Sequence, residues 1–379
     1  MSLQKQWLTR NFVIICRLLE IIGINALTVS FRPNWRTVYT VSMIVLALVQ
    51  ILYLLWCERS NLLSFMIVLP NWLFTFQGLM MNLRKSDKLL SLRSKLSEIQ
   101  QMLSEIESNG PIICDVLKMS YFLQTIIFMF YLSSVVLVLL MPFVLWLVLG
   151  KKMLMFVFFV PGTDASTNEG FLLCMAMHAV MMPAAFFGYT GHECMFLGFV
   201  MPVAAYVDAF ANEIQELNSY LTPPKPDQTV IRNQLNRIVK FHQLLNEYEA
   251  MLEDLYNVLI LNKVGLNYLG IIITIVVILK LNDRMAYIFF ALMFEQLTQV
   301  CLMGTIITVK NEQLLGHIYD INWYLLPADQ MKHVGLMLHQ AQNPTSVTIG
   351  KYAPLNVESY MTLLRSIFSY VMVLVTFFE

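Results

Sequence analysis

The feature that most constrains this chain is a set of long segments without a charged residue. Residues 119–150 contain no Asp, Glu, Lys or Arg over 32 positions. A helix rises about 1.5 Å per residue and needs roughly 20 apolar residues to cross the hydrocarbon core of a bilayer. A segment of this kind predicts a membrane-spanning helix, and the chain contains several.

Composition supports this interpretation. The chain has 379 residues, of which 58% are hydrophobic and 13% are charged. Soluble domains carry about 25% charged residues, so the composition argues against a water-soluble globule. The fold class predicted is an all-α integral membrane protein with seven transmembrane helices. The candidate spans are 37–57, 62–83, 126–150, 170–209, 264–279, 285–309 and 357–378.

The distribution of Lys and Arg predicts the orientation. The N-terminal segment and alternate connections hold five, six, five and three basic residues, nineteen in total, whereas the other connections hold five. Cytoplasmic loops keep the excess of basic residues. The sequence therefore predicts a cytoplasmic N-terminus and, with seven spans, an extracellular C-terminus.

Helical periodicity continues outside the spans. Phe12, Ile15, Leu19 and Ile22 recur at helical spacing in residues 1–36, which predicts an amphipathic helix that is cytoplasmic or re-entrant. Similar stripes occupy 84–107, 231–248 and 318–342. These segments predict a cytoplasmic helical layer under the membrane bundle.

The sequence gives no sign of catalytic, metal or nucleic-acid chemistry. Equal numbers of basic and acidic residues, 25 each, argue against a nucleic-acid partner. His192 and Glu193 begin like a zinc motif, but Phe196 stands where the second histidine is needed. We expect no enzyme activity, no cofactor and no metal site. A hydrogen bond between helices and a gating role both remain open for His192 and Glu193.

The last span carries a stripe of small hydroxyl residues around one aliphatic side chain. Thr362, Ser366, Ser369, Val373 and Thr376 are three or four positions apart and share one helix face. A narrow aqueous path with a dewetting constriction needs such a face. A helix packing face enriched in small residues has the same pattern, so both interpretations stay open at this point.

Aromatic and Met side chains gather in the outer halves of four spans. Such residues with one or two polar groups are the usual lining of a pocket for a small apolar ligand. For each of them taken singly, lipid-facing or core packing is the more common role, and only the set indicates a pocket. The candidate ligand-binding residues are Trp72, Phe143, Met175, His178, Met182, Tyr287 and Phe290.

The C-terminal third contains four recognisable segments: a Q-L-x-x-x-C-x-x-G run in 296–304, a Y-x-x-x-W-Y pattern in 319–324, the segment G-K-Y-A-P-L-N-V-E-S-Y in 350–360, and a Ser-Tyr pair at 369–370. Together these segments resemble the insect odorant receptor family. The resemblance implies an odorant-gated, non-selective channel for monovalent and divalent cations, with one pore lined by the last helix. On this chain Val373 would form the gate, with Thr376 and Phe377 beside it.

The resemblance also implies the partners and the location. The chain lacks the long intracellular insertion of the shared co-receptor, so it is similar to a tuning subunit that joins that co-receptor in a heterotetramer. Its ligand would be a small volatile odorant, and its place the lipid of the plasma membrane in the sensory dendrite of olfactory neurons. The domains expected are 1–36, the N-terminal helix; 37–309, six spans with the ligand pocket and intracellular extensions; 310–344, cytoplasmic anchor helices; and 345–379, the pore-lining helix.

The main alternative is a seven-helix G-protein-coupled receptor without channel activity. That class has its N-terminus outside, against the count of basic residues, and the chain has no D-R-Y after the third span or N-P-x-x-Y in the seventh. A transporter would show broken helices repeated in two halves, and the sequence shows none.

Overall fold

The computed structural model describes residues 3–23, 27, 33–57, 86–104, 106, 108–154, 160, 162–222, 227–281 and 284–377. Its helices are α1 (Leu3–Ile21), α2 (Trp35–Cys57), α4 (Ser86–Leu103), α5 (Asn109–Leu149), α6 (Asn168–Leu221), α7 (Gln228–Leu281), α8 (Arg284–Tyr319), the 3-10 helix η1 (Trp323–Leu325), α9 (Ala328–Ala341) and α10 (Val357–Phe377). Two short strands, β1 (Thr348–Ile349) and β2 (Ala353–Pro354), pair antiparallel before α10.

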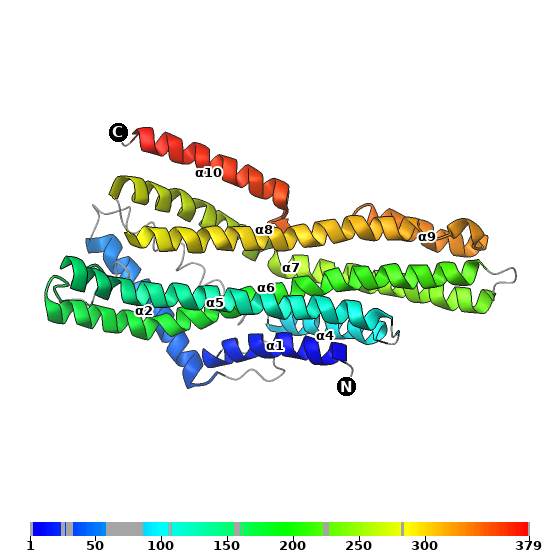
Figure 1. Ribbon diagram of the computed structural model, residues 1–379, viewed down its shortest axis with the longest axis horizontal. Helices are drawn as coiled ribbons and strands as arrows, with labels where there is room; N and C mark the ends of the chain where they lie inside the picture. Colours follow the sequence, from blue (N-terminus) through cyan, green and yellow to red (C-terminus); the bar gives the residue numbers. More distant parts are fainter. Residues whose placement is uncertain are drawn as a thin grey trace.

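The long helices lie along the longest axis of the molecule (Figure 1). α6 packs against α5, α7 and α8, and α7 also packs against α8 and α4. α10 lies at one end of the bundle, beside α7 and α8, and α9 lies at the other. We call the end where α5 stops and α6 and α8 begin the loop end.

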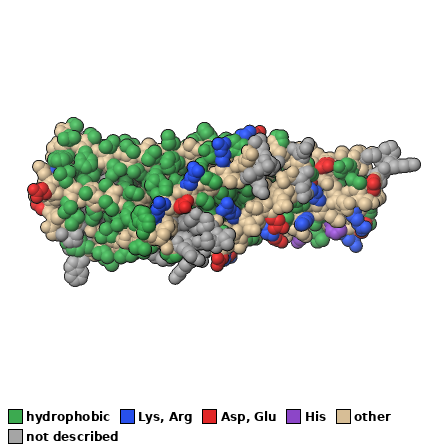
Figure 2. Space-filling model, turned by 90° about the horizontal axis from the view of Figure 1, so that it is seen from below, with side chains coloured by type: hydrophobic (Ala, Val, Ile, Leu, Met, Phe, Trp, Pro, Cys, Tyr) green, Lys and Arg blue, Asp and Glu red, His purple; other side chains and the backbone are tan. Residues whose placement is uncertain are grey.

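Five helices within the described residues, α5, α6, α7, α8 and α10, are long and apolar enough to cross a membrane, and Trp35–Gln50 of α2 is a shorter apolar helix. The predicted span 62–83 lies outside the described residues. Figure 2 shows hydrophobic side chains covering the half toward the loop end, while charged side chains gather over the other half. The all-α membrane fold predicted from the sequence is confirmed.

α6 and α7 have 54 residues each, which corresponds to about 81 Å of helix and far exceeds the roughly 30 Å of a hydrocarbon core. Both helices therefore continue beyond the membrane, as predicted. Their extensions pack with α4, whose stripe Leu89, Leu92, Leu96, Ile99 and Leu103 is at most 1% exposed. The predicted amphipathic helices at 84–107 and 231–248 are confirmed.

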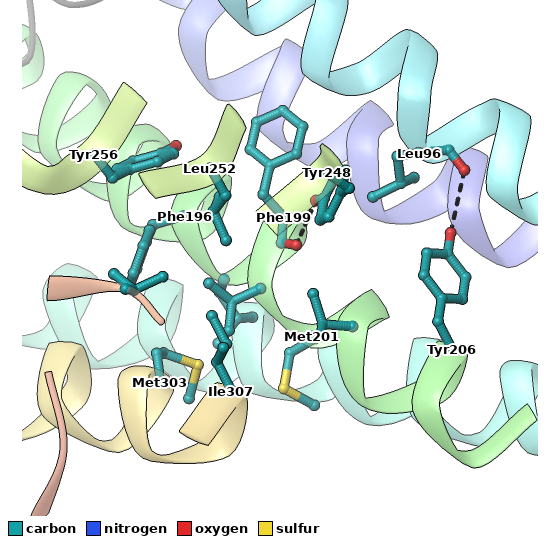
Figure 3. Packing of buried hydrophobic residues seen from close by; sticks show 14 of the residues in the cluster. Leu96, Phe196, Phe199, Met201, Tyr206, Tyr248, Leu252, Tyr256, Met303 and Ile307 are labelled. Atoms are coloured by element: carbon teal, nitrogen blue, oxygen red, sulfur yellow. Dashed lines mark hydrogen bonds between the residues drawn. The ribbon is translucent and has the colours of Figure 1, made fainter. Parts of the chain in front are cut away.

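Two buried tyrosines fix the junction between α4, α6 and α7 (Figure 3). Tyr206 of α6 donates a hydrogen bond to the carbonyl of Leu96 at 3.2 Å. Tyr248 of α7 donates to the carbonyl of Phe199 at 2.6 Å. Because these hydroxyl groups are paired, the aromatic rings can be buried without leaving a polar group unsatisfied.

α1 is amphipathic as predicted. Phe12, Ile15 and Leu19 are at most 2% exposed and face α5 and α6, whereas Arg17 and Glu20 are exposed. The Asn11 side chain also donates to the carbonyl of Leu117 on α5 at 3.0 Å. α1 is therefore an integral part of the bundle.

The sequence predicts one amphipathic stretch over 318–342 with Pro327 inside it. The structure divides this stretch into separate helices. α8 runs on to Tyr319, η1 follows, and α9 starts only at Ala328. Proline has no N–H to donate and a fixed φ, so it is tolerated just before or at the start of a helix and breaks a helix interior. Pro327 accordingly stands at the N-cap of α9.

The run 350–360 contains the turn and second strand of a hairpin, followed by a helix cap. Gly350 and Lys351 have φ of 60° and 66° and close the turn between β1 and β2. Glu253 of α7 accepts a hydrogen bond from the Thr348 amide at 2.8 Å, which ties the hairpin to α7. The Asn356 side chain then accepts from the amide of Ser359 at 2.9 Å and caps α10.

Candidate functional site

A cavity of about 130 Å³ lies between α5, α6 and α8. Each of these helices contributes residues spaced three or four positions apart, so one face of each helix borders the cavity. The described lining residues are Tyr131, Ser134, Val135 and Val138 of α5, Met182, Ala185, Phe186, Tyr189 and Thr190 of α6, and Phe289, Leu292 and Gln296 of α8.

The lining changes from apolar to polar with depth. α5 runs toward the loop end, while α6 and α8 run away from it. Val138, Met182 and Phe289 are therefore nearest the loop end, and the deepest lining residues include Thr190 and Gln296. The cavity has apolar walls and a polar floor, which suits a small molecule with one polar group.

A buried polar cluster lies beside this floor. The Tyr131 hydroxyl donates to the Glu295 carboxylate at 2.6 Å. Farther along α6, the Lys263 ammonium of α7 lies 2.6 Å from both carboxylate oxygens of Glu193. The two side chains of this ion pair are 11% and 2% exposed. A buried pair with this geometry holds α6 and α7 in one register, and it gives Glu193 a hydrogen-bonded partner on a neighbouring helix.

The structure places the predicted ligand-binding residues in different surroundings. Met182 lines the cavity. Nearer the loop end, Phe143 and Met175 pack in a cluster around Phe171, with the rings of Phe143 and Phe171 6.0 Å apart. His178, also on α6, is fully buried.

Two predicted residues of α8 lie outside the described lining. Tyr287 is 53% exposed, and Phe290 is half-buried with its ring stacked on Phe294 at 5.8 Å. Trp72 lies outside the described residues. Sequence reasoning did not select Tyr131, Ser134, Thr190 or Gln296, although their helical spacing from Val138, Met182 and Phe289 carried a usable signal.

The α10 stripe is mostly exposed in the single chain. Thr362, Ser369 and Thr376 are exposed, and Val373 is 61% exposed. Ser366 instead shares a hydrogen bond of 2.6 Å with the hydroxyl of Tyr268 on α7. The side chain of Phe377 lies outside the described side chains.

Side-chain hydrogen bonds tie α10 to α7 and α8. Besides the Tyr268–Ser366 bond, Tyr360 shares a hydrogen bond of 2.8 Å with Thr298 of α8. The ring of Tyr370 meets that of Tyr268 edge-on at 6.4 Å. α7 therefore contacts both the Glu193 carboxylate and the stripe-bearing helix.

Over the ranges that the structure describes, no group of three or more His, Cys, Asp or Glu side chains is placed to hold a metal ion. The described site is a cavity next to the Tyr131–Glu295 hydrogen bond and the buried Glu193–Lys263 ion pair.

Comparison with known proteins agrees with this architecture. The sequence model of the 7tm odorant receptor family matches residues 60–368. A putative odorant receptor 83c of Drosophila melanogaster is 23% identical over 252 residues, which cover 63% of this chain and 63% of that relative. The matched region thus spans less than two thirds of that relative's length.

Solved structures show the same fold. The insect olfactory receptor OR5 from Machilis hrabei, in complex with eugenol, superposes with a TM-score of 0.81 at 15% identity over 98% of both chains. The same receptor described without eugenol gives 0.77 at 15% identity over 97% of this chain and 98% of that chain. Because the family match covers far more than half of the sequence, the chain is a multi-pass membrane protein that belongs to the insect odorant receptor family.

Proposed function

We propose that this protein is a subunit of an odorant-gated, non-selective cation channel. A small volatile molecule binds in the cavity between α5, α6 and α8, and α10 lines the central pore. The observation that carries the proposal is the cavity itself, which has apolar walls and a polar floor inside a membrane bundle. A solved receptor with the same fold is described in complex with eugenol, which supports a ligand pocket in this architecture.

The geometry supports a route from the cavity to the pore. The cavity floor adjoins the Tyr131–Glu295 bond, α6 holds α7 through Glu193 and Lys263, and α7 holds α10 through Tyr268. A ligand shifts this arrangement only if it binds the open conformation more tightly than the closed one. In the closed state Val373 forms a dry constriction, and spreading of the α10 helices hydrates it.

Assembly is part of the proposal. The stripe of α10 is exposed in one chain, and an aqueous path requires further chains to enclose it. We assign the chain the role of a tuning subunit in a heterotetramer with the odorant receptor co-receptor, conducting monovalent and divalent cations in the plasma membrane of olfactory dendrites. Ligand contacts are assigned to the cavity lining, with Phe143, Met175 and His178 above it toward the loop end.

Filling the cavity tests the proposal. Met182→Trp replaces a flexible thioether by a bulky indole ring among the apolar walls. It should abolish the odorant-evoked current, because the indole fills the volume that the ligand needs. Leu172→Trp is the matched control, since Leu172 is on the same helix but 47% exposed. Surface labelling of both variants measures delivery to the membrane. A full odorant response in Met182→Trp at normal surface level would contradict the assigned pocket.

A further inference from the structure

Two hydrogen-bonding atoms at the floor of the cavity have no partner among the described residues. They are the Oγ1 atom of Thr190 and the Oε1 atom of Gln296. Thr190 is fully buried and Gln296 is 3% exposed. A buried polar atom without a partner costs about 1–3 kcal/mol, and such atoms in a native fold point to a bound group.

Two other hydroxyl groups of the lining have hydrogen-bond partners. The Tyr131 hydroxyl donates to Glu295 at 2.6 Å, and the Ser134 hydroxyl donates to the carbonyl of Phe130 at 2.9 Å. The two unpaired atoms differ in what they need. A threonine hydroxyl can donate one hydrogen bond and accept others, whereas an amide oxygen only accepts.

Building on the odorant-binding function above, we infer that this cavity selects small volatile alcohols. The ligand hydroxyl donates its proton to Oε1 of Gln296 and accepts the proton of the Thr190 hydroxyl. Its hydrocarbon part lies among Val138, Met182 and Phe289 toward the loop end. A ketone can satisfy Thr190 but leaves Gln296 unpaired, and a hydrocarbon leaves both atoms unpaired.

Solvent does not remove this preference. Water that enters the empty cavity can pair with both atoms, and a ligand that displaces it loses affinity unless it reproduces those bonds. A hydroxyl reproduces both. The cavity volume of about 130 Å³ is close to the roughly 150 Å³ of an engineered apolar cavity that holds benzene, so the ligand is a compact molecule with a six-membered ring or a short chain.

Three molecules of nearly equal shape separate the cases: cyclohexanol, cyclohexanone and methylcyclohexane. We measure odorant-evoked whole-cell current with the co-receptor, and in parallel the thermal unfolding midpoint of the purified protein with each molecule. Cyclohexanol should be about tenfold or more potent than methylcyclohexane, the factor expected when a buried polar group loses its partner. Cyclohexanone should fall between them. Equal potency of the three molecules would overturn the inference.

Variants assign the preference to the two side chains. Thr190→Val removes a hydroxyl at nearly constant shape and Gln296→Met removes the amide, so each should reduce cyclohexanol potency about tenfold and leave methylcyclohexane unchanged or improved. Thr190→Ser keeps the hydroxyl and should therefore retain the alcohol response that Thr190→Val loses. Ser133→Ala is the control, because its hydroxyl donates to the carbonyl of Phe130 at 2.8 Å, as that of Ser134 does, but Ser133 is exposed and outside the lining. If Thr190→Val keeps the full alcohol preference, the inference is wrong.

Failure of this inference differs from failure of the proposed function. A receptor that responds to other odorants but does not distinguish the three molecules remains an odorant-gated channel with a different ligand class. A protein whose unfolding midpoint rises with cyclohexanol, but which gives no current with any odorant, keeps the alcohol site and loses the channel function.

Discussion

At the residue scale, close packing against Leu355 explains why the motif in 296–304 ends in a glycine, Gly304. A Cβ atom at this position of α8 would lie 2.1 Å from the carbonyl oxygen of Leu355 and 2.5 Å from its Cγ atom. Leu355 belongs to the segment between the hairpin and α10, and its amide donates to the carbonyl of Val347 at 3.0 Å. Glycine is required here because the start of the last helix rests directly on α8.

Gly304→Ala should therefore destabilise the protein by several kcal/mol, since backbone has to move to relieve the overlap. Gly316→Ala on the same helix is the matched control. No atom lies within 4 Å of its added Cβ, so alanine there should stabilise by about 0.5–1 kcal/mol through helix propensity. Thermal unfolding in detergent measures both, and equal midpoints for the two variants would refute the close contact.

The buried carboxyl group of Glu249 predicts that the folding stability of the protein depends on pH. Glu249 lies on α7 before the predicted span 264–279, is 2% exposed, and accepts a hydrogen bond from Asn311 at 3.0 Å. Burial raises the pKa of its carboxyl group from 4.5 to about 8, although the Asn311 bond lowers it in part. Between these values the folded protein keeps a proton that the unfolded chain releases, so stability falls as pH rises.

Glu249→Gln cannot titrate and should remove this slope. Its stability relative to wild type should increase by about 2 kcal/mol between pH 6 and pH 8. Glu312→Gln, an exposed position on α8 next to Asn311, should keep the wild-type slope. Unfolding midpoints measured across this range decide the matter, and parallel pH profiles for Glu249→Gln and wild type would exclude a raised pKa.

Residue roles were only partly predictable from the sequence. Met182 lines the cavity, but Tyr287 of the same predicted set is 53% exposed. Both are large and apolar in an outer half-span, and only the rotation of each helix separates them. Helical spacing places Thr190 and Gln296 on the lining faces, but the sequence does not show that Oγ1 of Thr190 and Oε1 of Gln296 lack a partner, because this depends on how three helices assemble.

At the element scale, the buried ion pair between Glu193 and Lys263 connects α6 and α7. Glu193→Gln should cost about 3–5 kcal/mol, because it leaves the Lys263 ammonium buried without its counter-charge. The double variant Glu193→Gln with Lys263→Met should recover most of that loss. Asp254→Asn is the control, since its pair with Lys88 has side chains 64% and 55% exposed and contributes about 0–1 kcal/mol. A Glu193→Gln variant as stable as Asp254→Asn would contradict this account.

α10 carries the prediction for the gate. Val373→Ser replaces the constricting side chain by a polar one, so it should raise the current in the absence of odorant by making the constriction easier to hydrate. Met372→Ser is the control on the same helix, as Met372 is 51% exposed but lies off the stripe. Patch recordings of both variants measure the effect. A Val373→Ser channel that stays closed without odorant removes Val373 from the gate.

Elements with a strong periodic pattern were predictable, and those set by special backbone geometry were not. The stripes of α1, α4 and α7 gave their buried faces directly. The β1–β2 hairpin has strands of two residues each, too short for an alternating pattern, and it depends on Glu253 more than ninety positions away. The break before α9 follows from Pro327, which interrupts the amphipathic stretch because proline cannot donate a backbone hydrogen bond.

At the scale of the whole molecule, the equal numbers of acidic and basic residues conceal an uneven distribution. Charged side chains gather over one half of the visible face, and hydrophobic side chains cover the half toward the loop end (Figure 2). The fold class was predictable because a bilayer admits only helices with apolar surfaces of this length. The assembly was not, because the exposed stripe of α10 has its meaning only beside other chains.

The central claim is that odorant binding opens an ion pathway within the receptor assembly itself. Whole-cell current tests it most directly, recorded with an odorant panel in cells that express this chain alone, the co-receptor alone or both, with G-protein signalling blocked. We predict an odorant-evoked, non-selective cation current only in cells with both chains, unchanged by the block. A response that disappears when G proteins are blocked would contradict the account and favour a G-protein-coupled receptor.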